Sequence, residues 1–211
     1  AGSPESMRTM LTAARTRQIA PGAHPSYPDR SGFGRRSIDI SLEELEACLT
    51  SQLQDIRNMA DQVGVPLTHL KPHGALYNDA QDDPALSGLL VDMSARAGLA
   101  LVSMPKSLIQ KKAAERNIRF IGEAFIDRRY TAGGRLLPRS EEGAVIEDES
   151  DRIVQGLTLA KGGALAAQDG TILQVAAHSL CLHSDSDGAL ETARKMRMAL
   201  EKAGIAISAV K

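Results

Sequence analysis

The feature that most constrains this chain is the alternation of short strand-like segments with amphipathic helical ones. Strand patterns occur at about 18–24, 66–73, 99–104, 118–126, 178–184 and 205–210. Helical patterns occur from Pro4 to about 14, at 41–63, and at about 83–97, 106–116, 148–162 and 187–203, and 164–175 reads as a hairpin. Strands that alternate with helices of this length form βαβ units around a parallel sheet. The sequence therefore predicts an α/β fold with six such strands besides the hairpin.

The helix over 41–63 is the clearest single element. Ser41 and Glu44 form a capping box, apolar residues follow at helical spacing, and Gly64 is a stop signal. The first helix has a similar start, since Ser3 suits the N-cap and Pro4 the first helical position.

Bulk composition limits the class of protein. The 211 residues, with a formal charge of -1, are expected to form one domain, and no basic surplus points to nucleic acid or an anionic membrane. No apolar run reaches the roughly 18–20 residues of a membrane span, and the N-terminus lacks a signal-peptide pattern. Two cysteines without a C-x-x-C motif exclude a disulfide framework, so a reducing, cytoplasmic compartment is expected.

Polar clusters follow four of the predicted strands. They read "GAHPSYPD", "LKPHGALYND", "EAFIDRRY" and "LCLHSDSDG", and each lies between a strand end and a helix start. In parallel α/β folds, functional residues gather at the carboxyl ends of strands. The sequence thus predicts that the four clusters share one mouth.

In the second cluster, alternation along a strand places His69, Lys71 and His73 on one face. The position of His73 at the strand end favours a functional role, whereas the deeper His69 is more typical of a hydrogen-bonded core histidine. Lys71 needs an anionic neighbour, either a phosphate or a structural carboxylate. Two histidines four residues apart on a strand are about 13 Å apart, too far to bind one metal ion together.

The remaining clusters offer further candidates, each with a structural alternative. His24 ends its strand and serves either a functional or a loop-capping role. Glu123 and Asp127 are four residues apart, and a glycine-containing loop with arginines follows them; such a loop either holds a phosphate or is a solvated connector. At the end of the last cluster, His183 is the stronger functional candidate, while Asp185 also fits helix capping, with Ser186 or Asp187 as the expected cap residue.

Several common signatures are absent from the sequence. It contains no P-loop, no G-x-G-x-x-G dinucleotide fingerprint and no G-x-S-x-G nucleophile elbow. Any nucleotide or nucleophile chemistry must therefore use another arrangement.

Long motifs, taken in order, resemble those of the LamB/YcsF family. They are "GAHPSYPDRSGFGRR", "HLKPHGALYN", "EAFIDRRYTAGGRLLPRS" with "GAVI", and "LCLHSDSDGA", and the resemblance covers nearly the whole chain. It implies a distorted seven-stranded (β/α) barrel of the glycoside hydrolase/deacetylase type. It also implies the family's activity as the A subunit of 5-oxoprolinase, which opens 5-oxo-L-proline to L-glutamate with hydrolysis of ATP, together with B and C subunits.

Three departures from the family pattern are visible. The family begins with a strand carrying a D-x-N-x-D-x-G-E type motif, which is missing here, in line with six strands counted against seven. Ser3 stands where the family has Asp, and Ser184 replaces the usual Gly of an H-G-D motif. We therefore expect reduced activity from this chain alone.

The resemblance and the chemistry together suggest roles. Phosphorylation of the amide oxygen would activate the lactam, so the site needs cations for phosphate, a base for water and an acid for the ring nitrogen. Lys71 is assigned to phosphate, His73 and His183 to proton transfer, and Asp185 or Asp127 to orienting a histidine or Mg²⁺ brought with ATP. The residues expected to line the substrate and ATP sites are His24, Asn78, Glu123, Asp127, Arg128 and Arg139.

Two alternatives remain open. One is a metal-dependent deacetylase acting on a carbohydrate or amide, for which zinc held by His24, His73 and His183 would be evidence. The other is a non-catalytic binding protein within a larger enzyme. Oligomeric state is also open, with a homo-oligomer among the options.

Overall fold

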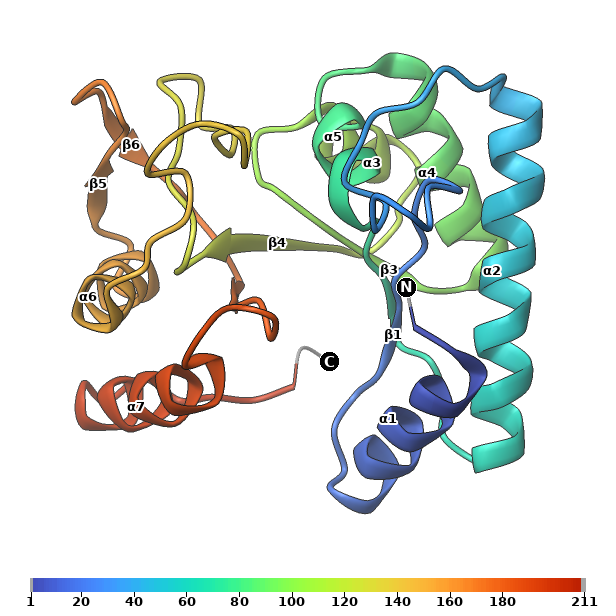
Figure 1. Cartoon of the computed structure of the whole chain (residues 1–211), viewed down its shortest axis with the longest axis horizontal. Coiled ribbons are helices and arrows are strands. Elements are labelled where there is room, and N and C mark those ends of the chain that lie inside the picture. Colours follow the sequence, from blue (N-terminus) through green and yellow to red (C-terminus); the bar gives the residue numbers. More distant parts are fainter. Residues whose placement is uncertain (1, 210–211) are drawn as a thin grey trace. The chain divides into compact units, whose positions relative to one another are not determined.

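The computed structural model describes residues 2–209, and the chain divides after Phe120 into two units (Figure 1). Unit 1 comprises Ala1–Phe120 and unit 2 comprises Ile121–Lys211. Each unit combines helices with parallel strands, so the predicted α/β class is confirmed. The expectation of a single barrel domain stays a prediction.

Unit 1 contains three short strands and five helices among its described residues. In chain order these are α1 (Pro4–Thr16), β1 (Gly22–Ala23), α2 (Leu42–Val63), β2 (His69–Leu70), α3 (Gly74–Asp79), α4 (Pro84–Ala97), β3 (Ala100–Ser103) and α5 (Leu108–Glu115). The strands are parallel in the order β1-β2-β3, with His69 aligned to Gly22 on one side and to Ala100 on the other. This register places the ends of β1 and β2 next to each other.

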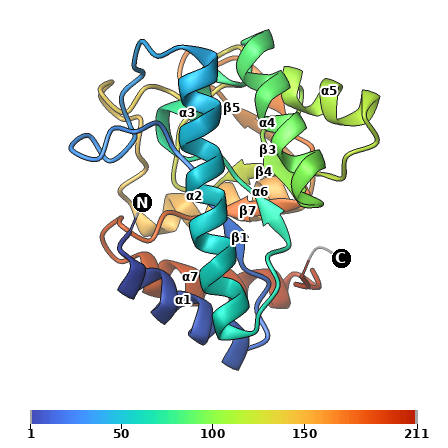
Figure 2. The ribbon, with the colours of Figure 1, turned by 90° about the vertical axis from the view of Figure 1, so that its right-hand side faces the viewer.

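Helices α1 and α2 begin where the sequence predicts. The Ser3 side chain caps α1, and the Ser41–Glu44 capping box opens α2, which ends at Gly64 in a left-handed conformation. Arg15 donates from Nη1 to the Val63 carbonyl oxygen, so α1 lies against the carboxyl end of α2 (Figures 1 and 2). Apolar side chains of α2, α4 and the strands form the main core.

Unit 2 holds a second parallel pair and an antiparallel hairpin. Its elements are β4 (Phe120–Phe125), α6 (Glu149–Ala160), β5 (Ala164–Ala166), β6 (Ile172–Gln174), β7 (Ser179–Cys181) and α7 (Ala189–Lys202). β4 and β7 run parallel, with Phe125 aligned to Cys181, and β5 and β6 form the predicted hairpin. α6 and α7 lie side by side and pack on Ile126 (Figure 1).

Three details differ from the sequence predictions. The strand predicted at 205–210 is wrong for 205–209, where no ladder forms, and Val210 lies outside the described residues. α7 is preceded by Gly188 in a left-handed conformation and has no side-chain cap, so the prediction of Ser186 or Asp187 as the cap is wrong. The short helix α3 was not predicted, because six residues are too few to show a helical period.

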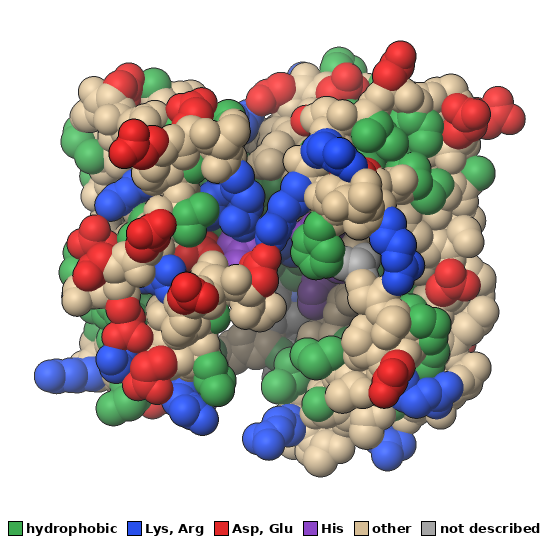
Figure 3. All heavy atoms as spheres, viewed as in Figure 1, with side chains coloured by type: hydrophobic (Ala, Val, Ile, Leu, Met, Phe, Trp, Pro, Cys, Tyr) green, Lys and Arg blue, Asp and Glu red, His purple; other side chains and the backbone are tan. Residues whose placement is uncertain are grey.

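Acidic and basic side chains are interspersed over the visible face of each unit (Figure 3), in keeping with the formal charge of -1. Among residues 2–209, every helix is too short or too polar to cross a bilayer.

Candidate functional site

In unit 1, the backbone beyond β1 and β2 continues the ladder and brings two polar clusters together. Lys71 N–H donates to the Ala23 carbonyl oxygen at 2.9 Å, and His73 N–H donates to that of Pro25 at 2.8 Å. His24 and His73 are therefore held side by side, as expected for the ends of adjacent parallel strands.

The two imidazoles form a continuous chain of hydrogen bonds between two main-chain carbonyls. His24 Nδ1 lies 2.7 Å from the Lys71 carbonyl oxygen, His24 Nε2 lies 3.0 Å from His73 Nδ1, and His73 Nε2 lies 2.7 Å from the Phe33 carbonyl oxygen. Carbonyl oxygens only accept, so both outer ring nitrogens must carry hydrogen. The central contact needs a third hydrogen, whereas two neutral imidazoles carry only two. The pair makes all three bonds when it holds one extra proton and a single positive charge.

The surroundings indicate which ring stays neutral. Desolvation by the surrounding protein, followed by the positive charges of Lys71 and His73, lowers the pKa of His24. His73 is buried and packs edge-on against the Phe33 ring at 5.1 Å between centroids. If the pair holds an extra proton, the lowered pKa of His24 leaves that proton on the His73 ring.

The loop that carries Phe33 is fastened at both ends. Asp29 accepts from Arg36 Nε at 2.9 Å and from the Gly32 N–H at 3.0 Å, and its pKa is lowered to about 2 by these bonds, the Arg36 bond first. Gly74 must be glycine, since its φ is 62° and a Cβ there would lie 2.2 Å from the Gly34 carbonyl oxygen.

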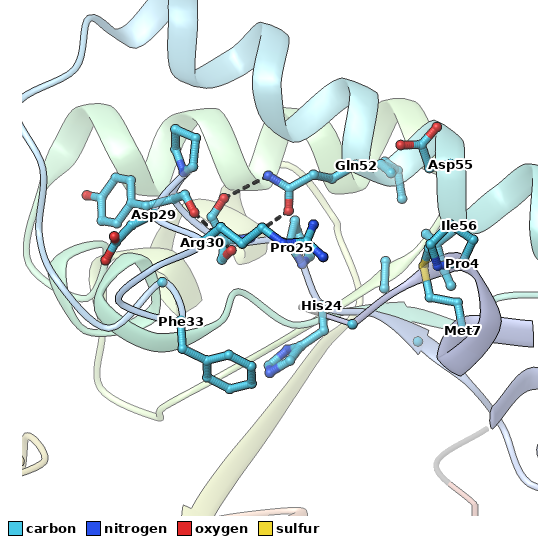
Figure 4. Close-up of a pocket in the computed structure, with 18 residues that line it drawn as sticks. Pro4, Met7, His24, Pro25, Asp29, Arg30, Phe33, Gln52, Asp55 and Ile56 are labelled. Carbon is cyan, nitrogen blue, oxygen red and sulfur yellow. Dashed lines mark hydrogen bonds between the residues drawn. The ribbon is translucent and has the colours of Figure 1, made fainter. Parts of the chain in front are cut away.

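A cavity of about 750 Å³ in unit 1 is lined by α1, by the loop after β1, which includes His24, and by α2. Figure 4 shows Met7 and Ile56 at one side and His24 with Phe33 at another. Gln52 spans the wall by hydrogen bonding to both the N–H and the carbonyl oxygen of Ser26.

In unit 2, the ends of β4 and β7 bring Asp127 and His183 together. Asp127 Oδ2 accepts from the backbone N–H of His183 at 2.9 Å and from its Nδ1 at 2.8 Å. The Asp127 side chain is fully buried, and burial alone would raise its pKa, but the bonds from His183 hold that pKa below its usual value. The Phe125 ring stacks on the imidazole at 5.7 Å between centroids.

This arrangement fixes the tautomer of His183. An ionised Asp127 can only accept, so Nδ1 of His183 carries the hydrogen and Nε2 of the neutral ring has a free lone pair. Within residues 2–209, Nε2 has no hydrogen-bond partner, and the side chain keeps 24% of its surface exposed. The pair has the geometry of a carboxylate-oriented general base.

The other predicted residues of unit 1 lie close to the histidine pair. Lys71 is half-buried and lies 5.9 Å from the centre of the Tyr77 ring. Asn78 is exposed on α3, and its side-chain amide donates to the Gly74 carbonyl oxygen.

The other predicted residues of unit 2 differ in exposure. Glu123 is buried on β4, while Asp185 and Arg139 are exposed on loops. Arg128 is buried, and its guanidinium donates to the main-chain carbonyls of Ala144 and Leu137. That contact uses part of its donor capacity for fixing the loop, a role that sequence reasoning missed.

Sequence reasoning also missed the contribution of main-chain carbonyls. The Phe33 and Lys71 carbonyl oxygens set the proton count of the histidine pair. No sequence pattern reports a main-chain acceptor, although the glycines of "SGFGRR" mark the loop as one of close backbone approach.

Titratable side chains lie at the carboxyl ends of parallel strands, and one of them is a histidine oriented by a carboxylate. This arrangement is typical of the active sites of α/β enzymes. The LamB/YcsF family model matches residues 1–211, and the chain belongs to that family.

Relatives and solved structures agree with this membership. The 5-oxoprolinase A subunit of Streptomyces coelicolor is 42% identical over 211 residues, which cover 99% of this chain and 84% of the relative. The crystal structure of the lactam utilization protein from Thermus thermophilus has a TM-score of 0.89 at 36% identity and covers 100% of this chain and 85% of its own.

A more distant structure is similar in fold alone. It is a protein of Enterococcus faecalis named for cellobiose-phosphate cleavage, with a TM-score of 0.53 at 16% identity over 95% of this chain and 81% of its own.

Proposed function

We propose that this chain is the A subunit of a 5-oxoprolinase, which opens the lactam of 5-oxo-L-proline to L-glutamate with hydrolysis of ATP to ADP and phosphate. The observation that carries the proposal is 42% identity to a 5-oxoprolinase A subunit over 99% of the chain. The designation A also implies B and C partner subunits for the complete reaction. The finer fold we propose is the distorted (β/α) barrel of the glycoside hydrolase/deacetylase type.

The chemistry requires phosphate stabilisation, a base and an acid. A lactam is a stabilised amide, and phosphorylation of its oxygen makes the ring carbon a better electrophile for water. His183, oriented by Asp127, supplies the lone pair that takes a proton from water. The His24–His73 pair, in the form that holds one extra proton, would donate to the ring nitrogen as it leaves, once one of its N–H bonds to a main-chain carbonyl opens. The acyl phosphate that remains is then hydrolysed by a second water to glutamate and phosphate.

ATP is a co-substrate of the proposed reaction, and positively charged side chains and side-chain oxygens of this chain would bind its phosphates and the accompanying Mg²⁺. Lys71 is our candidate for the transferred phosphoryl group, with Asn78, Glu123, Arg128 and Arg139 as further contacts. Since Asp127 is committed to His183, the exposed Asp185 is the better carboxylate for Mg²⁺ bound to ATP phosphates.

The metal-dependent deacetylase is the weaker alternative on geometric grounds. In the His24–His73 pair, each of the four ring nitrogens already faces a protein partner, so a metal ion would have to break these bonds. Within residues 2–209, no group of three or more His, Cys, Asp or Glu side chains is arranged to hold a metal ion.

The test is glutamate formation from 5-oxoproline and ATP, measured for this chain alone and with B and C subunits. We expect ATP-dependent glutamate only with the partners present. Glutamate that does not appear under either condition, while a full-length family member is active in the same assay, would instead favour a non-catalytic binding role.

A further inference from the structure

α6 presents two buried polar side chains to the backbone that carries the Asp127–His183 pair. Arg152 and Gln155 are three residues apart, on one face of the helix, and are only 3% and 8% exposed. Neither was singled out by the sequence, and the proposed reaction does not use either directly.

Arg152 joins two separate segments. Its Nε donates to the Ile146 carbonyl oxygen at 2.6 Å, and its Nη1 donates to that of Asp187 at 2.9 Å. Ile146 in turn donates its N–H to the main-chain carbonyl oxygen of Asp127, and Asp187 belongs to the loop that follows His183. One guanidinium thus fastens the segment beside the carboxylate to the loop behind the imidazole.

Gln155 acts on the strand end itself. Its Nε2 donates to the carbonyl oxygens of Phe125, at 2.7 Å, and Arg128, at 2.9 Å, which bracket Asp127 on the chain. The helix can approach this closely because Gly156 follows: a Cβ there would lie 3.1 Å from Ile126 Cγ2 and 2.4 Å from Met196 Sδ.

The charge of Arg152 makes a purely architectural role a poor explanation. Within residues 2–209 it forms no ion pair, and the two acceptors of its hydrogen bonds are neutral carbonyls. A buried arginine without a carboxylate is costly, and an apolar residue could fill the same space at lower cost. The planar fork of arginine lets Nε and Nη1 reach two carbonyls from different segments at once.

We propose that Arg152 and Gln155 are positioning residues that hold Asp127 and His183 in hydrogen-bonding register, and so keep Nε2 of His183 as the free, proton-accepting nitrogen. The inference rests on the proposed function only for the reaction in which Nε2 of His183 accepts a proton.

The first test measures the tautomer and needs no turnover. The chain has five histidines, so ¹⁵N-histidine spectra are simple, and the loss of one signal set in His183→Gln assigns that residue. We expect wild type to show His183 protonated at Nδ1 and bare at Nε2. Arg152→Gln and Gln155→Met should shift that ring toward a mixture of tautomers, while Arg194→Gln, the same change at an exposed arginine of α7, should leave it unchanged.

The second test measures turnover in the reconstituted enzyme. Misplacement of a reacting group by about 1 Å can cost on the order of 100-fold in rate, so Arg152→Gln should lower kcat by roughly 10- to 100-fold with little change in KM. Arg152→Lys, which keeps the charge but not the fork, should recover part of the loss.

The proposal is overturned if folded Arg152→Gln and Gln155→Met lower only the melting temperature and keep the Nδ1-protonated tautomer. If Arg152→Gln does not fold, Gln155→Met, which removes no charge, carries the test. A wild-type protein with the expected tautomer but no glutamate formation in any combination with its partners contradicts the proposed function and still supports the positioning role.

Discussion

His183 shows how one contact sets the chemistry of a residue. The carboxylate of Asp127 accepts two bonds from this histidine, one from the main chain and one from the ring. The main-chain bond fixes the position of the His183 backbone, and the ring bond fixes the orientation of the imidazole. The result is a nitrogen with a defined protonation state on a half-buried, stacked ring.

Asp127→Asn tests that contact. An amide oxygen can still accept from Nδ1, but it carries no charge to stabilise the imidazolium that forms when His183 takes a proton. We expect kcat in the reconstituted enzyme to fall by roughly 10²- to 10⁴-fold, the usual contribution of general acid–base catalysis. Asp151→Asn, which removes an exposed carboxylate paired with Arg129, is the control and should stay within a factor of about two. Near-normal turnover of Asp127→Asn would remove the pair from the mechanism.

The His69 ring on β2 leaves room only for glycine at position 22. A Cβ at this position would lie 2.3 Å from Nε2 of His69, so Gly22→Ala must displace the ring, and we expect a loss of about 1–3 kcal/mol in the free energy of unfolding. Urea unfolding measures it. The same substitution in a His69→Ala background should cost much less, because the ring is gone.

Gly88 is the matched control for that prediction. It lies within α4, and a Cβ there would meet only Lys112 Nζ at 3.6 Å. Gly88→Ala should therefore stabilise by up to about 1 kcal/mol through helix propensity. Equal effects of the two substitutions, or no relief from His69→Ala, would contradict the steric explanation.

At the scale of elements, the loop between β1 and α2 is held by charge. Asp29 is ionised at neutral pH, and its folded-state pKa of about 2 lies below the 3.8 of an unperturbed aspartate. A lowered pKa means that the unfolded chain binds the proton more tightly, so the stability from this group is complete above about pH 4 and is lost as the pH falls toward 2.

Urea midpoints measured between pH 5 and pH 2 check this expectation. They should fall more steeply for wild type than for Asp29→Asn, which has no carboxylate to protonate and is less stable at neutral pH. Asp169→Asn is the comparison variant, because it also removes one carboxylate whose pKa is lowered, but at an exposed turn of unit 2. Parallel curves for wild type and Asp29→Asn would show that the Arg36 contact contributes little.

Sequence patterns correctly predicted the helices and strands that depend on residues close together in the chain. The capping box at Ser41, the stop at Gly64 and the alternation of strands with helices each depend on neighbouring residues, and the structure has them. The prediction of a strand is wrong for 205–209 because β-branched residues make a strand only where a partner supplies a ladder.

The candidate site was predictable in part for the same reason. Placement of His24, His73, Asp127 and His183 at strand ends followed from the general rule for parallel sheets. Their pairing with one another, and the buried Arg152 and Gln155, depend on contacts between segments far apart along the chain. No local pattern encodes such contacts, and Arg152 looks like any helix-surface arginine in the sequence.

At the scale of the whole molecule, each unit holds its own histidine group, and the roles proposed for the two groups need opposite protonation states. The base, His183, must be neutral with Nε2 free, whereas the His24–His73 pair must hold its extra proton. Acidification removes the base and alkalinity removes the acid, so the rate of glutamate formation should fall on both sides of an optimum.

The two limbs of this pH profile can be assigned by substitution. His24→Gln removes the second ring that shares the proton with His73, so it should move the alkaline limb and leave the acidic limb in place. Asp127→Asn leaves an acceptor for Nδ1 of His183 but removes its charge, so it should lower kcat without moving the alkaline limb. Profiles of kcat against pH for the reconstituted enzyme, with Asp151→Asn as the control for both limbs, make the comparison. If His24→Gln moved the acidic limb instead, the acid and base would be exchanged between the two histidine groups, and the proton count of the His24–His73 chain would no longer support its role as donor.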